Sequence, residues 1–151
     1  MSYIVVTYNT TTMKTIYAFG LLFLISFGVQ AQSARISVSE LPVAARSFLN
    51  QHYKYRPIEY IRKKEQDGFP YTVKLAQGTQ ICFGENGDWC KVDGDGASLP
   101  KALVPNPIAS YIKTNYPKKR ITLIEKDNDK FDINLNNNIG LEFDAKGNPT
   151  K

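Results

Sequence analysis

The central part of the chain alternates hydrophobic and polar residues. In residues 71–83, aliphatic and aromatic side chains occupy every second position of two segments, which flank a Gln-Gly pair at 77–78. The same alternation returns in residues 131–143, around an Asn-Asn pair at 137–138. Alternation with a period of two is typical of β-strands that bury one face and expose the other. The sequence therefore predicts a half-buried antiparallel sheet whose central part occurs twice.

A segment with helical spacing precedes each copy. The first helix is predicted over residues 41–52 and the second over residues 102–116, with prolines confined to the first turns. One further strand is predicted after each helix, at residues 58–64 and 121–126. Like residues recur at an offset of 63 in the helices and first strands (Pro42 and Pro105, Ser47 and Ser110, Tyr53 and Tyr116) and at an offset of 60 in the later strands (Leu75 and Leu135, Phe83 and Phe143, Gly87 and Gly147).

This order of elements predicts an α+β fold of two tandem repeats, residues 41–94 and 99–151. Each repeat is one helix followed by three or four antiparallel strands, an α-β-β-β-β unit. Because one helix covers one face of a small sheet, we expect both helices to pack on the same face of a curved sheet. The last residues are too few for a complete fourth strand in the second repeat.

Residues 13–31 have the features of a secretory signal peptide. A lysine precedes an apolar run, and small residues at positions −3 and −1 allow cleavage near Ala31. Translation is then expected to begin at Met13, with residues 1–12 an upstream extension. The apolar run is shorter than the roughly 20 residues that a membrane span needs, with a membrane anchor as the alternative. We therefore expect a mature protein of residues 32–151 that is periplasmic or secreted.

The chain has two cysteines, Cys82 and Cys90. Export to an oxidising compartment would permit a disulfide between them. The intervening residues 85–87 fit a three-residue hairpin loop, whose register places Phe83 opposite Trp89 and the two cysteines opposite each other. We therefore predict a disulfide, with two free thiols as the alternative. Two cysteines without nearby histidines supply only half of a zinc site.

Charge and composition exclude several classes of function. The chain has 19 Lys and Arg against 14 Asp and Glu, and this mild excess forms no stripe of the kind that nucleic-acid binding needs. Its one histidine, His52, lies at the end of the first predicted helix. The loop at residues 93–96 begins like a calcium loop, but Ala97 and Val104 stand where oxygen ligands are required. We expect no catalytic residues, no cofactor and no metal, and so no enzyme.

The second face of the predicted sheet carries the candidate site. One hypothesis is that a protein partner docks on this polar face, and the alternative is that water alone covers it. The residues predicted to project there are Thr72, Lys74, Gln80, Cys82 and Lys91 from the first repeat and Asp132, Asn134 and Glu142 from the second.

The segments LPVAARSFLNQHY, YTVKLAQGTQICFGENGDW, VPNPIASYIKTNY and FDINLNNNIGLEFDAKGN resemble the PepSY-like family of exported bacterial proteins. The resemblance covers residues 41–151 and rests on a helix that begins with Leu-Pro, a Y-x-V-x-L strand, an I-x-F strand and a D-x-x-G-x-W turn. Gly84 stands where that turn usually begins with Asp, and the cysteines lie outside the pattern.

What this resemblance implies is a fold like the β-lactamase-inhibitor protein, with no catalytic residues to carry over. It also implies a periplasmic or secreted binding or inhibitory module. The expected partner is a protein such as a peptidase or another envelope enzyme. The alternative function is a small-ligand or metal carrier or sensor in the periplasm.

Overall fold

The computed structural model describes residues 34–64 and 69–150 of the 151-residue chain. In chain order its elements are β1 (Ala34–Arg35), η1 (Val38–Glu40), α2 (Val43–Tyr53), β2 (Ile58–Lys63), β3 (Tyr71–Leu75), β4 (Gln80–Phe83), β5 (Trp89–Asp93), η2 (Lys101–Leu103), α3 (Asn106–Asn115), β6 (Ile121–Asp127), β7 (Lys130–Leu135) and β8 (Ile139–Asp144), where η marks a 3₁₀ helix. The predicted N-terminal extension, signal peptide and cleavage site lie outside the described residues.

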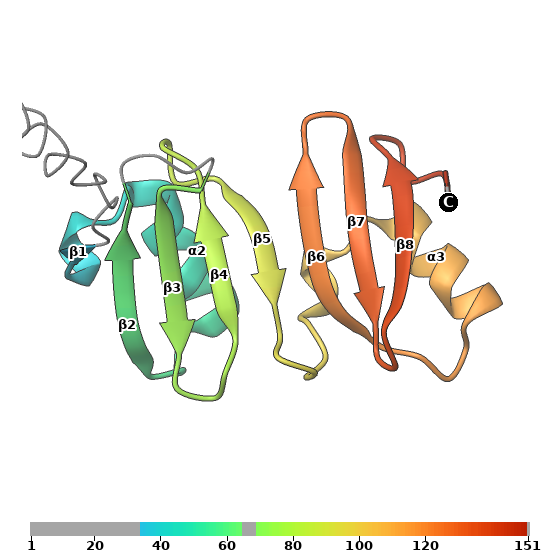
Figure 1. The fold of residues 1–151 in the computed structure, drawn as a ribbon, viewed down its shortest axis with the longest axis horizontal. Coiled ribbons are helices and arrows are strands. Elements are labelled where there is room, and N and C mark those ends of the chain that lie inside the picture. The colour runs from blue at the N-terminus through green and yellow to red at the C-terminus, as the bar shows by residue number, and fades with distance from the viewer. Residues whose placement is uncertain (1–33, 65–68, 151) are drawn as a thin grey trace, which may run out of the picture. The chain divides into compact units, whose positions relative to one another are not determined.

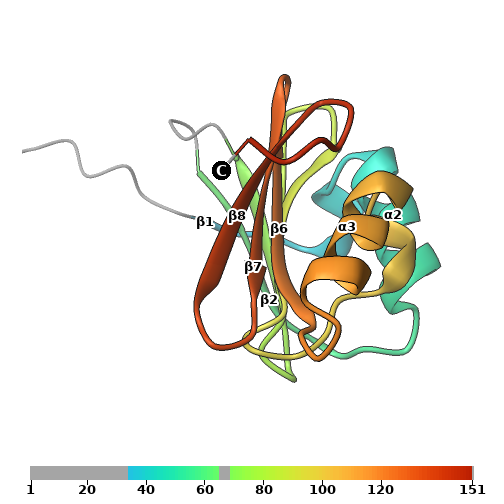
Figure 2. The ribbon, with the colours of Figure 1, turned by 90° about the vertical axis from the view of Figure 1, so that its right-hand side faces the viewer.

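Among the described residues, the strands form one open antiparallel sheet of eight strands in the order of the sequence (Figure 1). Seen along the sheet, α2 and α3 lie on the same side of it (Figure 2). The fold is therefore α+β, with both helices on one face of a curved sheet, as the sequence predicts.

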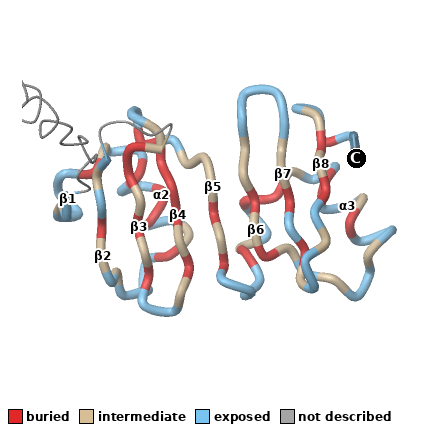
Figure 3. Tube along the Cα trace, in the orientation of Figure 1, coloured by how far each residue is buried: buried red, intermediate tan, exposed pale blue. Residues whose placement is uncertain are grey.

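The core lies between the helices and the sheet. In β3 the burial alternates strictly, so that Tyr71, Val73 and Leu75 face the helices, and β2 and β4 to β8 also contribute buried residues (Figure 3). Aromatic rings connect each helix to the sheet: Phe48 contacts Phe83, and Tyr111 contacts Phe143. Apolar burial on one face only leaves the other face of the sheet to polar residues.

The second helix begins later than predicted. Residues 101–103 form a 3₁₀ turn, and α3 starts at Asn106 rather than at Ala102. Val104 is extended, with φ −98° and ψ 122°, because the ring of a following proline disfavours the α conformation. Pro105 thus separates two short helical pieces where the spacing of apolar residues alone predicts one helix.

Both edges of the sheet are partly paired. The lead-in segment before the first helix forms β1, where Arg35 lies opposite Arg62 in β2; the sequence did not predict this strand. At the other edge the chain turns back along β8, and the Thr150 N–H donates to the Glu142 carbonyl at 2.8 Å. Paired or covered edges reduce the risk of edge-to-edge association.

The register of the hairpin between β4 and β5 differs from the prediction at the cysteines. Phe83 lies opposite Trp89, as predicted, but Cys82 lies opposite Lys91. A β-bulge between these two pairs leaves Cys90 as the extra residue. Both cysteines are free thiols. The predicted register of the cysteines was therefore wrong, and the structure contains no disulfide between them.

Burial explains the bulge. An uninterrupted register would turn Lys91 toward the helices and Val92 away from them. The bulge instead places Val92, which is 0% exposed, opposite Ile81 in the core. Burying the valine is worth about 1.5–3 kcal/mol, whereas a buried lysine would cost several kcal/mol. The preference of Val92 for the core and of Lys91 for solvent thus overrides the simple hairpin register.

Candidate functional site

The face of the sheet opposite the helices, called here the open face, carries a continuous row of side chains. Adjacent members of this row are paired across neighbouring strands, so the row crosses the whole described sheet. We call it the central row, and in order from β1 to β8 it consists of Arg35, Arg62, Thr72, Cys82, Lys91, Glu125, Asp132 and Glu142.

A second row runs beside the first from β2 to β8. Its members are Tyr60, Lys74, Gln80, Asp93, Leu123, Asn134 and Gly140. Together the two rows contain every residue that the sequence predicts for this face. The structure therefore brings the predicted site residues together on one surface.

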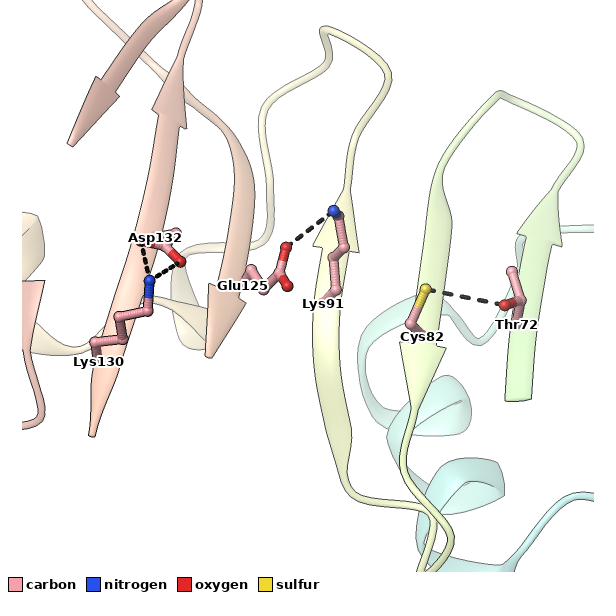
Figure 4. A network of polar contacts seen from close by, with 6 residues as sticks. All are labelled: Thr72, Cys82, Lys91, Glu125, Lys130 and Asp132. Carbon is pink, nitrogen blue, oxygen red and sulfur yellow. Dashed lines mark hydrogen bonds and ion pairs between the residues drawn. The ribbon is translucent and has the colours of Figure 1, made fainter. Parts of the chain in front are cut away.

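The central row changes sign in the middle of the sheet. Its cations, Arg35, Arg62 and Lys91, come from β1 to β5, and its carboxylates come from β6, β7 and β8. At the boundary Lys91 Nζ lies 2.9 Å from Glu125 Oε2, with side chains 31% and 30% exposed (Figure 4). The hydrogen bond from Lys91 to Glu125 raises the pKa of the lysine. The central row is thus basic at one end and acidic at the other, with an ion pair where its halves meet and a second ion pair, between Lys130 Nζ and Asp132 Oδ2 at 3.0 Å, in its acidic half (Figure 4).

Cys82 lies in the middle of the central row. Its Sγ is 3.9 Å from Thr72 Oγ1 (Figure 4), and the residue is 6% exposed. Burial raises the pKa of the Cys82 thiol and also that of Cys90. Nucleophilic cysteines need a lowered pKa, so neither thiol has the environment of a reactive cysteine.

Sequence reasoning missed the basic end of the face. There the Arg62 guanidinium lies 4.4 Å from the centroid of the Tyr60 ring, and that of Arg35 lies 5.7 Å from it. Two arginines over one tyrosine make a cation–π cluster. Glu125 was also missed, although its position directly after the core residue Ile124 in a predicted strand was a usable signal.

The other candidates from the sequence have structural explanations. The Asp95 N–H donates to Asp93 Oδ1 at 2.9 Å, so the carboxylate closes its own turn, as Asp often does. His52 is in the last turn of α2, with its ring 4.8 Å from that of Phe48. In residues 34–64 and 69–150 no group of three or more His, Cys, Asp or Glu side chains could hold a metal ion.

Neither α2 nor α3 is long and apolar enough to cross a membrane, and no other described segment forms a helix that is.

Comparisons with known proteins agree with this geometry. A family described as "Putative beta-lactamase-inhibitor-like, PepSY-like" matches residues 69–151. No curated protein matches the sequence.

Three solved structures share the fold. One is a "putative calcium-regulated periplasmic protein" from Bacteroides thetaiotaomicron, 29% identical, covering 79% of this chain and 94% of its own, with a TM-score of 0.75. A "putative periplasmic protein" from Bacteroides vulgatus is 29% identical, covering 80% and 95%, with a TM-score of 0.74. A second periplasmic protein of that organism, of unknown function, is 31% identical, covering 80% and 98%, with a TM-score of 0.74. These neighbours support export of the present chain.

Proposed function

Because the chain belongs to the PepSY-like family, we propose that it is an exported, non-enzymatic module that binds a protein partner through the open face. The family's description as β-lactamase-inhibitor-like supports a binding role without catalysis. The periplasmic neighbours support a partner in the cell envelope or outside the cell.

The observation that carries this proposal is the central row. It crosses all eight described strands on the face that the helices leave uncovered. Charges of opposite sign occupy its two halves, and such patterns select partners and accelerate encounter more than they raise affinity. The fitting partner therefore presents acidic side chains near Arg62 and basic side chains near Glu142.

The inhibitory form of the proposal adds that the partner is an enzyme, such as an envelope peptidase. A sheet is a rigid platform, and a rigid surface binds with little loss of conformational entropy. Docked over an active-site cleft, such a surface would exclude substrate.

We also infer that the two halves are tandem repeats. Phe48 and Phe83 meet with ring centroids 5.5 Å apart and planes at 84°. Tyr111 and Phe143, which lie 63 and 60 residues later, meet at 5.5 Å and 82°. A shared ring geometry at corresponding positions supports duplication of one helix-and-sheet unit.

Export is proposed to use residues 13–31 as a cleaved signal peptide. Intact mass of the protein from the exported fraction of the native cell tests this, and a chain beginning at Gln32 is expected. A mature chain that retains Met1 would contradict it.

Affinity purification from the exported fraction tests whether a protein partner binds to the open face. The bait is compared with Arg62→Glu and Glu142→Lys, which reverse charges at opposite ends of the central row. A matched control, Lys113→Glu, reverses an exposed charge on α3, on the other side of the sheet.

One stoichiometric protein should be recovered with the bait and the control, and lost with both open-face variants. If the recovered protein is an enzyme, titration with the bait should abolish its activity. An unchanged partner recovered with both open-face variants would exclude this face.

A further inference from the structure

We propose that a groove beside α3 binds a single-chain anionic amphiphile, such as a fatty acid. The groove has a volume of about 500 Å³, within the usual range of small-molecule sites. It lies on the helix side of the molecule, between the segment before α3, the helix itself and the segment that leads into β6. The apolar side chains that line it are Leu99, Val104, Ala109, Ile112, Tyr116 and Ile121.

Backbone hydrogen bonds hold the three walls of the groove in place. The Leu99 N–H donates to the Ile121 carbonyl at 3.1 Å and ties the first wall to β6. The Tyr116 N–H donates to the Ile112 carbonyl at 2.8 Å, and the Lys119 N–H donates to the Tyr116 carbonyl at 2.9 Å. The groove is therefore preformed, so a ligand need not order the chain in order to bind.

The rim of the groove is basic. Lys101, Lys113, Lys119 and Arg120 line it, and no Asp or Glu of the described chain does. Residues 100–120 as a whole contain five Lys or Arg and no Asp or Glu. An apolar floor with a purely cationic rim complements a ligand that combines an apolar chain with an anionic head group.

The exposed apolar residues argue for a single bound chain rather than a membrane surface. Surface-binding helices project large apolar side chains toward the bilayer. In the described chain the exposed large hydrophobic residues are Val38, Val43 and Tyr55, and none of them belongs to α3 or to this groove. Here the apolar surface is recessed in an open groove, which suits one hydrocarbon chain laid along it.

A smaller groove lies at the equivalent position beside α2. It measures about 180 Å³ and is lined by Leu49, Tyr53 and Ile58, which lie 63 residues before Ile112, Tyr116 and Ile121 of the larger groove. The helix position occupied by Ala109 in the larger groove is occupied by Arg46 in the smaller one. The long arginine side chain takes up space that alanine leaves open.

Calorimetric titration with dodecanoate, below its micellar concentration, tests the site. We expect one dodecanoate per protein, with dodecyltrimethylammonium and neutral dodecyl maltoside binding at least about tenfold more weakly, because the rim repels cations and gains nothing from a neutral head. Equal binding of the cationic amphiphile would overturn the proposal. So would adsorption to anionic phospholipid vesicles by a protein that does not bind dodecanoate.

Substitution of Ala109→Arg separates groove filling from charge attraction. It makes the larger groove resemble the smaller one and also adds a positive charge. If the groove holds the chain, dodecanoate affinity should fall about tenfold or more, because the side chain occludes the site. Unchanged or tighter binding would show that attraction to surface charge alone is responsible and would overturn the proposal.

The double substitution of Lys113→Glu and Lys119→Glu tests the head-group contact. It should also weaken the binding of dodecanoate. A control charge reversal outside the groove, Lys74→Glu on the open face, should leave dodecanoate affinity unchanged. This groove and the open face lie on opposite sides of the sheet, so failure of either proposal leaves the other intact.

Discussion

The ring of Phe48 in α2 meets the ring of Phe83 in β4 edge to face, with centroids 5.5 Å apart and planes at 84°. Phe83 is 0% exposed and Phe48 is 9% exposed. This contact connects the first helix to the centre of the sheet on which the open face is built. The geometry is one that aromatic pairs prefer, because the positive edge of one ring meets the negative face of the other.

Truncation of this pair should therefore destabilise the protein. Phe83→Ala is expected to lower the free energy of unfolding by about 3–5 kcal/mol, since it opens a large cavity in the core. A double-mutant cycle with Phe48→Leu should give a coupling energy of about 0.5–1.5 kcal/mol, measured by urea denaturation. A coupling near zero would show that the rings pack without a specific edge-to-face interaction.

Gly87 is expected to tolerate no side chain. Its φ is +82°, and a Cβ there would lie 2.6 Å from Pro42 Cβ and 2.9 Å from the Ala45 nitrogen at the start of α2. Gly96 is a matched control, with φ +81° and nothing within 4 Å of a built Cβ.

Gly96→Ala should cost about 1–2 kcal/mol from backbone strain alone, and Gly87→Ala should cost about 1–3 kcal/mol more from the clash. Thermal unfolding of both variants measures the difference. Equal losses would mean that the hairpin tip moves away from α2 at little cost.

Tyr53→Phe should raise the stability of the protein. The Tyr53 hydroxyl is buried and has no hydrogen-bond partner among the described residues. An unsatisfied buried polar group costs about 1–3 kcal/mol, so its removal should raise the free energy of unfolding at neutral pH by about 1 kcal/mol. Tyr116→Phe, at a half-buried position, is the control and should have little effect. A loss of stability in Tyr53→Phe would reveal a partner for the hydroxyl.

The same tyrosine should make stability fall at high pH. Burial raises the pKa of Tyr53 to about 12, against about 10 in an unfolded chain. Because the unfolded chain ionises this tyrosine more readily than the folded protein does, the free energy of unfolding is unaffected below about pH 10 and falls as the pH rises through about 12. Urea denaturation across this window should show a steeper decline for the native protein than for Tyr53→Phe. Parallel curves would contradict the raised pKa.

The two cysteines are expected to behave as unreactive thiols. Burial raises the pKa of both, which reduces the thiolate fraction at neutral pH and slows alkylation. Cys90 should react before Cys82, because Cys82 is the more buried. Unfolding without reductant should allow iodoacetamide to label both, as intact mass would show. A mass lower by two hydrogens, with no label, would demonstrate a disulfide and contradict the free thiols.

The alternation of apolar residues predicted most of the strands, and the turn residues predicted where they reverse. Gly87 adopts a positive φ in the loop where glycine was required, and Asn137 and Asn138 do so in the hairpin between β7 and β8. These features are local, because alternation depends on the pleat and a left-handed turn depends on one or two residues. The order of Lys91 and Val92 also indicated the bulge, because a regular register would have placed the lysine in the core and the valine on the open face.

The sequence by itself determined the α+β class, the strand faces and the turns, because each follows from side-chain pattern within a few residues. Only the tertiary structure decided that residues 34–35 pair with β2, that Cys90 is set aside in a bulge and that Pro105 divides the second helical segment. It also decided which charges stand side by side in the central row and which walls close the groove beside α3. Cross-strand neighbours depend on register between distant segments, and a shift of one residue exchanges the two faces of a strand.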